Sequence, residues 1–316
     1  MQRFKNVLLV IDENAESRAA LPQAVALCHR NGAALTLVNV VDDPGRDLDL
    51  SFTPDFLANL ELEQLEARRD CLEELAEPLR AEGLRVNTRV LVGTPFLEII
   101  REVLRSRHDL VMMTAEGRSG LKEMLFGTTS MHLMRKCPVP VWVVKQDQPQ
   151  HYTRILAAIN PTSADGQKNG LDLKIMDLAT SLAELEQSEL HIVHTWQFIG
   201  ESTLRGGRSQ LSQAEVDQFL NSVEQAHRDS LNGLLANYDL NSLNYKIHLL
   251  NGGARELIPE IAKEYEVDLV VMGTVSRTGV AGFFIGNTAE SVLQQVNCSV
   301  LTVKPEGFVS PVTLDD

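Results

Sequence analysis

Short runs of apolar residues alternate with longer amphipathic stretches along the whole chain. The runs are flanked by turn residues, which is typical of strands buried inside a parallel sheet. They are Val7–Ile11, Ala34–Val41, Arg85–Val92, Leu110–Thr114 and Val139–Lys145, and then Ile155–Ile159, Leu190–Thr195, Tyr245–Leu250, Leu269–Thr274 and Ser299–Lys304. The pattern therefore predicts two sets of five strands.

Stretches with apolar residues at helical spacing separate the runs. They are Arg18–Arg30, Leu60–Leu79, Glu98–Glu102 and Thr128–Lys136, and then Leu171–Leu185, Asp217–Asn237, Glu256–Ile261 and Asn287–Val296. Alternating strands and helices predict an α/β protein of two tandem doubly wound, Rossmann-like domains. Each is expected to hold a five-stranded parallel sheet with helices on both faces. The expected domains are residues 1–147 and 153–306, followed by a tail of residues 307–316.

An internal repeat supports this division. A shift of 159 residues places Asp109-Leu110-Val111 on Asp268-Leu269-Val270 and Gly127 on Gly286. The same shift carries Lys145 onto Lys304. Matches at one constant shift are the mark of a duplicated structural unit.

The segment after each fourth strand is rich in small residues. It reads TAEGRSG-LKEMLF-GTT from Thr114 in the first half and GTVSRTG-VAGFFI-GNT from Gly273 in the second. Glycine lets the backbone approach a ligand closely, and the start of the following helix favours a phosphate. Ligands of open α/β sheets bind beyond the carboxyl ends of strands, where these segments lie.

These segments resemble the universal stress protein family, and the resemblance covers nearly the whole chain, once per half. Nucleotide-binding members show Gly-x2-Gly-x9-Gly-Ser/Thr after the fourth strand and an Asp at the end of the first. The resemblance implies binding of ATP with Mg²⁺ and the tandem, two-domain type of the family. The residues that it implies for nucleotide binding are Asp12, Val40, Gly117, Arg118, Gly127, Thr128 and Thr129 in the first half, and Asn160, Gly273, Ser276, Arg277, Gly286, Asn287 and Thr288 in the second.

Both copies depart from that motif. Thr114 stands at the first glycine position of the first half, where its Cβ could crowd a nucleotide, and Glu116 would oppose phosphates. In the second half Ser276 replaces the second glycine, and Asn160 replaces the first-strand Asp. Asparagine cannot supply the same charge-assisted hydrogen bonds. The residues leave open which half binds a nucleotide.

The amino-acid composition argues against two classes of partner, nucleic acids and membranes. The net charge of −14 repels phosphate backbones and anionic membranes, and aromatic residues make up only 5%. We therefore expect no nucleic acid and no membrane partner. Four cysteines without a CxxC pair and the absence of a signal-peptide pattern predict a cytoplasmic protein.

Other candidate sites are weaker. His191 and His194 are three apart on a strand, so they should face opposite sides of the sheet and are expected to be structural. No tightly bound metal is expected. The acidic stretch Asp42–Asp49 is expected to be a solvated loop, and segments 42–60 and 197–216 are candidate lids.

The leading expectation is a cytoplasmic stress-response protein that binds adenine nucleotide without strong catalysis; enzyme activity is left open. One alternative is a slow ATP hydrolase with Glu116 or Asp12 as base, although no Walker loop is present. Another is a scaffold with degenerate sites for a protein or another metabolite. The family resemblance also implies that the last strands, Val139–Lys145 and Ser299–Lys304, pair the two halves, and it leaves room for a homodimer.

Overall fold

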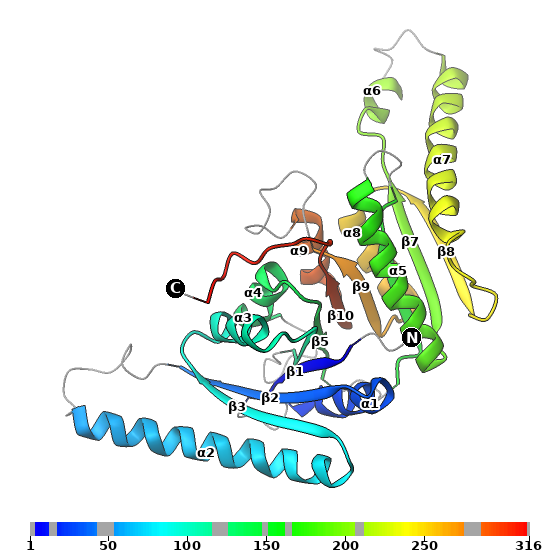
Figure 1. Ribbon diagram of the computed structural model, residues 1–316. Coiled ribbons are helices and arrows are strands. Elements are labelled where there is room, and N and C mark those ends of the chain that lie inside the picture. Colours follow the sequence, from blue (N-terminus) through cyan, green and yellow to red (C-terminus); the bar gives the residue numbers. More distant parts are fainter. Residues whose placement is uncertain are drawn as a thin grey trace.

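The computed structural model describes residues 4–12, 18–42, 54–115, 126–146, 151–161, 166–205, 212–274 and 286–314. Their strands form one ten-stranded sheet in the order β3-β2-β1-β4-β5-β10-β9-β6-β7-β8 (Figure 1). The first half supplies β1 (Asn6–Val10), β2 (Ala34–Val41), β3 (Arg85–Val92), β4 (Leu110–Thr114) and β5 (Val141–Val144). The second half supplies β6 (Arg154–Ile159), β7 (Glu189–Trp196), β8 (Tyr245–Asn251), β9 (Leu269–Gly273) and β10 (Ser299–Val303).

Within each half every neighbouring pair of these strands is parallel. The halves join where β5 and β10 run antiparallel, with Leu301 opposite Trp142. The predicted fold is therefore confirmed, and so is the predicted pairing through the last strands. The result is a single continuous sheet rather than two separate ones.

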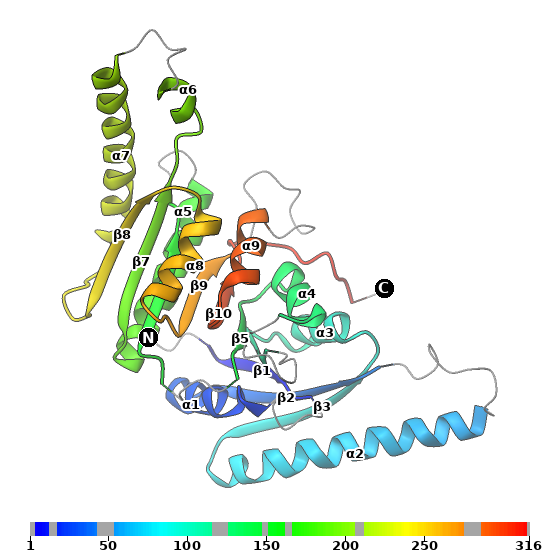
Figure 2. The ribbon, with the colours of Figure 1, turned by 180° about the vertical axis from the view of Figure 1, so that it is seen from behind.

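Helices cover both faces of the sheet. One face carries α1 (Leu21–Asn31), α2 (Pro54–Ala81), α5 (Gly166–Glu186) and α7 (Gln213–Leu235), and the other carries α3 (Pro95–Ser106), α4 (Thr128–Lys136), α8 (Ala254–Glu264) and α9 (Asn287–Gln295). The short α6 (Glu201–Arg205) lies beside α7 (Figures 1 and 2). Leu37 and Val38 of β2 show why two cores form, because successive side chains of a strand enter opposite layers.

Two lysines connect the halves, because each donates hydrogen bonds to backbone carbonyls of the other half. Lys304, directly after β10, donates from Nζ to the carbonyl oxygens of Met134 (2.6 Å) and Arg135 (3.0 Å) at the end of α4. It also donates to Thr274 Oγ1 at 2.6 Å. Its repeat equivalent, Lys145, donates from Nζ to the carbonyl oxygen of Asn297 at 2.9 Å. A cation at a helix C-terminus satisfies carbonyls that have no partner within the helix.

The segment after β10 returns to the first half (Figure 1). Val312 is buried in the core on the α3, α4, α8 and α9 side. Arg101 Nε of α3 donates to the carbonyl oxygen of Thr313 at 3.3 Å. The chain end thus adds a second connection between the halves.

None of the helices in the described residues is long and apolar enough to span a membrane.

Candidate functional site

Each half has one point where its strand order reverses. The chain runs from β1 outward to β2 and β3, whereas β4 lies on the other side of β1. The second half repeats this arrangement with β6, β7 and β9. A crevice for a ligand is expected at the carboxyl ends of the two strands that flank such a point. Those ends carry Asp12 and Thr114 in the first half, and Asn160 and Gly273 in the second.

In the first half, Asp12 follows β1 at this edge. The preceding Ile11 donates from its N–H to the carbonyl oxygen of Val38 at 2.8 Å, which aligns the end of β1 with β2. Val40, near the end of β2, is half-buried. The Asp12 side chain reaches solvent, yet the surrounding protein removes enough water to raise the pKa of its carboxyl above 3.8. Asp12 and Val40 therefore lie at the same edge of the sheet.

Helix α4 begins without a side-chain cap. Gly127 precedes the helix in an extended conformation and supplies no side-chain cap. Thr128 is exposed and Thr129 is half-buried. Ser130 Oγ donates to the carbonyl oxygen of Gly127 at 2.9 Å and steadies the turn. An uncapped helix start offers N–H groups and the positive end of the dipole to a phosphate.

The threonine at the first glycine position has a structural partner. Thr114 Oγ1 accepts a hydrogen bond of 3.1 Å from the N–H of Ala20, the residue that precedes α1. The side chain is only 5% exposed. The hydroxyl is thus directed toward the start of α1, so this substitution connects a strand end to a helix.

In the second half, helix α5 occupies the corresponding edge. The N–H of Asn160 donates to Asp172 Oδ1 at 2.9 Å. A Cβ added to Gly273 would lie 2.7 Å from Cδ2 of Leu171. The N–H of Gly286, before α9, donates to the carbonyl oxygen of Thr274 at 3.0 Å. The chain's own groups therefore contact the positions where the family motif expects a ligand.

Leu171 and Asp172 were not among the residues expected at this site. The sequence signal was available, because both stand at the start of the expected helix Leu171–Leu185. Only the folded structure shows that this helical turn lies at the ends of β6 and β9.

The contact at Gly273 yields a testable prediction. Gly273→Ala should lower the free energy of unfolding by about 1 kcal/mol, since the new methyl group displaces the end of the half-buried Leu171 side chain. In a Leu171→Ala background the same change should cost less than about 0.5 kcal/mol. Urea unfolding of the four proteins measures both values. Equal costs in the two backgrounds would show that Leu171 is not the obstacle.

The structure describes only some of the predicted site residues in the loops after the fourth strands. Gly117, Arg118, Ser276 and Arg277, and also Glu116, lie outside the described residues. Asn287 and Thr288 are exposed at the start of α9. The candidate lids are described only in part, without residues 43–53 in the first and without residues 206–211 in the second.

The two histidines of β7 face opposite layers, as expected. His191 Nδ1 lies 3.0 Å from His248 Nε2 on β8, and the His191 ring packs against Tyr265 near α8. His194 Nε2 lies 2.9 Å from His227 Nδ1 on α7. Among the described residues, no group of three or more His, Cys, Asp or Glu side chains could hold a metal.

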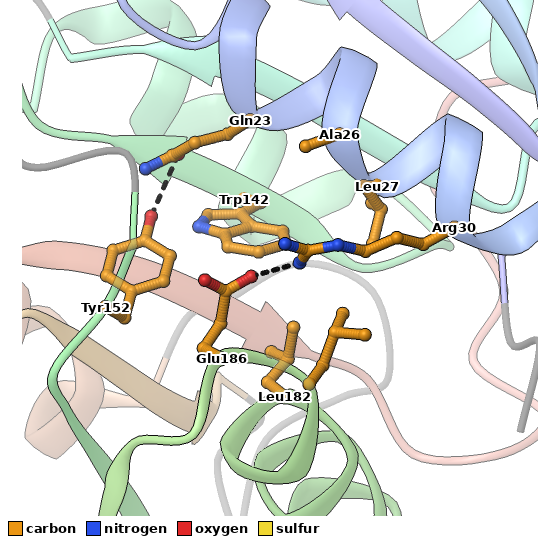
Figure 3. A pocket seen from close by; sticks show the side chains of 9 residues that line it. Gln23, Ala26, Leu27, Arg30, Trp142, Tyr152, Leu182 and Glu186 are labelled. Atoms are coloured by element: carbon orange, nitrogen blue, oxygen red, sulfur yellow. Dashed lines mark hydrogen bonds and ion pairs between the residues drawn. The ribbon is translucent and has the colours of Figure 1, made fainter.

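A small pocket lies between the halves, away from both strand edges (Figure 3). Arg30 of α1 forms an ion pair with Glu186 of α5, and Tyr152 Oη donates to Gln23 Oε1 at 2.9 Å. The residues that line it are Gln23, Ala26, Leu27, Arg30, Trp142, Tyr152, Leu182, Leu185 and Glu186. A cavity volume of about 20 Å³ admits water and is far too small for a nucleotide. This pocket is a feature of the interface between α1 and α5.

Comparison with known proteins agrees with the fold and the repeat. The model of the universal stress protein family matches residues 3–145 and again residues 151–304. Universal stress protein E of Escherichia coli K12 is 30% identical over 318 residues, which cover 100% of this chain and 99% of that protein. A functionally unknown protein from Pseudomonas aeruginosa PAO1 has a TM-score of 0.74 at 25% identity, covering 97% of this chain and 95% of that one. A universal stress protein from Archaeoglobus fulgidus, at 20% identity and a TM-score of 0.63, shares the fold, with 95% and 98% covered. The chain belongs to the universal stress protein family and joins two of its domains in tandem.

Proposed function

We propose that this protein is a cytoplasmic stress-response protein that binds ATP with Mg²⁺ in its first half and has no strong catalytic activity. The observation that carries the proposal is the difference between the two strand edges. Leu171 and Asp172 contact Gly273 and Asn160 in the second half. In the first half Asp12, at the position equivalent to Asn160, is exposed, whereas helices α4 and α9 both begin without a side-chain cap.

The chemistry of the first half suits a nucleotide. The start of α4, with Gly127, Thr128 and Thr129, would receive phosphates through backbone N–H groups. Asp12 would accept hydrogen bonds from ribose hydroxyl groups, and Val40 would offer an apolar surface to the base. Arg118, outside the described residues, adds a cation to the same loop in sequence. Bound Mg²⁺ would neutralise part of the charge of the phosphates.

The test is calorimetric titration of the full chain with ATP and Mg²⁺, together with two matched variants. Gly127→Val should weaken binding at least tenfold, because the side chain blocks close approach to the helix start. Gly286→Val, at the repeat-equivalent position, should leave the affinity within twofold of the parent. A larger loss with Gly286→Val would move the site to the second half.

The alternative function as a scaffold with degenerate sites has its own support. The Leu171 side chain packs at Gly273, so that an added Cβ would lie 2.7 Å from its Cδ2. If the intact chain gives neither heat nor a thermal shift with ATP and Mg²⁺, the scaffold takes precedence. Release of ADP above background by the purified chain would instead favour a slow hydrolase with Asp12 or Glu116 as base. Pairing of two chains stays a prediction for either function.

A further inference from the structure

Two histidines from neighbouring strands meet in the outer part of the second half. His191 lies on β7, and His248 lies on β8, the strand at this edge of the sheet (Figure 1). His191 Nδ1 is 3.0 Å from His248 Nε2. The ring of Tyr265, after α8, packs on both, with centroid distances of 4.6 Å and 5.0 Å. Because the His191 side chain is fully buried, water does not replace this contact.

The contact requires a single proton between the two nitrogens. A neutral imidazole has one donor and one acceptor nitrogen. His191 Nε2 makes no hydrogen bond within the described residues and lies 3.5 Å from Glu189 Oε2. A carboxylate favours a proton on the nitrogen that faces it. We therefore assign the proton of His191 to Nε2, so that His191 Nδ1 accepts from the Nε2–H of His248.

The charged groups around the pair come from β6, β7, β8 and α8. They are Arg154, Glu189, Lys246 and Glu264. Lys246 Nζ binds Glu189 Oε1 at 2.8 Å and lies over the Tyr265 ring at 5.2 Å. Burial is the largest cause that lowers the pKa of both histidines below 6.5, and Lys246 acts in the same direction. Glu189 partly opposes this effect.

We propose that the His191–His248 pair is an acid-sensitive latch that holds edge strand β8 on β7 at neutral pH and releases it when the pH falls. A proton added to His191 Nδ1 places N–H groups on both facing nitrogens, so the hydrogen bond is lost. A further proton on His248 Nδ1 then puts two positive charges in contact, beside Lys246. His248, which is half-buried, then turns toward solvent and gives up its packing on Tyr265.

The direction of the effect follows from linkage. In the folded chain the pKa of both histidines lies below the ordinary 6.5, so the unfolded or released strand binds protons more strongly. The latch is therefore fully present above pH 6.5 and is lost as the pH falls below it. Release exposes the backbone of β8 and loosens the end of α8 at Tyr265.

Hydrogen exchange of the full chain at pH 7.5 and pH 5.0 tests the latch. After correction for intrinsic exchange, the protection of β8 (Tyr245–Asn251) should fall at least tenfold at pH 5.0. Edge strand β3 (Arg85–Val92), which contains no histidine, is the internal control and should change less than twofold. Equal protection of β8 at both pH values would overturn the proposal.

A matched variant distinguishes protonation of the His191–His248 pair from other effects of low pH on β8. His191→Gln together with His248→Gln keeps a neutral donor and acceptor but cannot titrate in this range. Its β8 protection should fall less than threefold at pH 5.0. A loss equal to that of the parent chain would contradict the latch.

A titration of the unaltered chain does not depend on how the variant folds. With ¹⁵N-labelled histidine, NMR should show both rings neutral at pH 7.5, with His191 protonated on Nε2. Both should take up protons below pH 6.5, over the same range in which β8 loses protection. Independent titration of the two rings at or above pH 6.5 would overturn the proposal.

Discussion

Lys304→Met should lower the free energy of unfolding by about 3 kcal/mol at pH 7. Lys304 is 3% exposed, and its ammonium group donates to Met134, Arg135 and Thr274. Methionine keeps the apolar stem but removes these three bonds; the Met134 carbonyl keeps Thr274 Oγ1 as a donor at 3.1 Å, whereas the Arg135 carbonyl loses its ammonium partner. Relief of a buried charge works in the opposite direction, since burial lowers the pKa of Lys304 to about 8. The three lost charge-assisted bonds outweigh that relief, because a hydrogen bond to a charged group contributes about 1.5–3 kcal/mol.

The repeat supplies the control for this experiment. Lys145→Met removes the equivalent cation, whose bond to the carbonyl oxygen of Asn297 lies in exposed surroundings. Exposed contacts of this kind contribute little, so the expected loss is below about 1 kcal/mol. Urea unfolding followed by circular dichroism measures both variants. If Lys304→Met unfolds at the same urea concentration as the parent, the lysine does not hold the halves together.

Most of the fold was predictable because strands and helices leave different patterns of apolar residues in the sequence. Buried parallel strands leave short apolar runs, and helices packed on one side leave a 3.6-residue rhythm. Helix limits were less accurate. Helix α5 begins at Gly166, five residues before the expected Leu171, and α1 begins at Leu21 rather than Arg18. Helix α6 lies inside segment 197–216, for which no helix was expected before Asp217, since five residues are too few to show a period.

The candidate site was predictable only in part. The repeated glycines identified the loop after the fourth strand of each half. In a doubly wound sheet that loop lies at a topological switch point, where ligands bind. The asymmetry between the halves was not predictable. It depends on where Leu171 and the Thr114 hydroxyl point, and such directions follow from packing between elements far apart in sequence. The partnership of His191 with His248 was missed for the same reason, since 57 residues separate them.

Alkaline pH should destabilise the folded chain through its buried thiols. Cys28, Cys137 and Cys298 are buried, and burial raises the pKa of each thiol from 9.0 to about 12. Unfolded thiols lose their protons near pH 9, whereas the folded ones keep theirs. The stabilisation is therefore complete below pH 9 and is lost as the pH rises toward 12. By pH 10 the loss is about 1.4 kcal/mol for each thiol.

Deprotonation of Lys304 raises the free energy of unfolding over the same alkaline pH range. Its folded pKa of about 8 lies below the ordinary 10.5, so the folded chain releases this proton first. Stability gained from this group between pH 8 and pH 10 is about 2 kcal/mol, roughly half of the combined loss of about 4 kcal/mol from the three thiols. The parent chain should therefore lose about 2 kcal/mol over this range, the difference between two opposing effects.

Replacing all three buried thiols separates the two effects. The triple variant Cys28→Ala, Cys137→Ala and Cys298→Ala should be less stable than the parent at pH 8 because of the lost packing, yet it should gain stability between pH 8 and pH 10. Cys71→Ala, at a half-buried cysteine on α2, is the matched control and should keep the parent slope. Urea midpoints at four pH values measure the slopes. If the triple variant declines as steeply as the parent, ionisation of the buried thiols is not what weakens the fold, and the alkaline loss must arise from other groups.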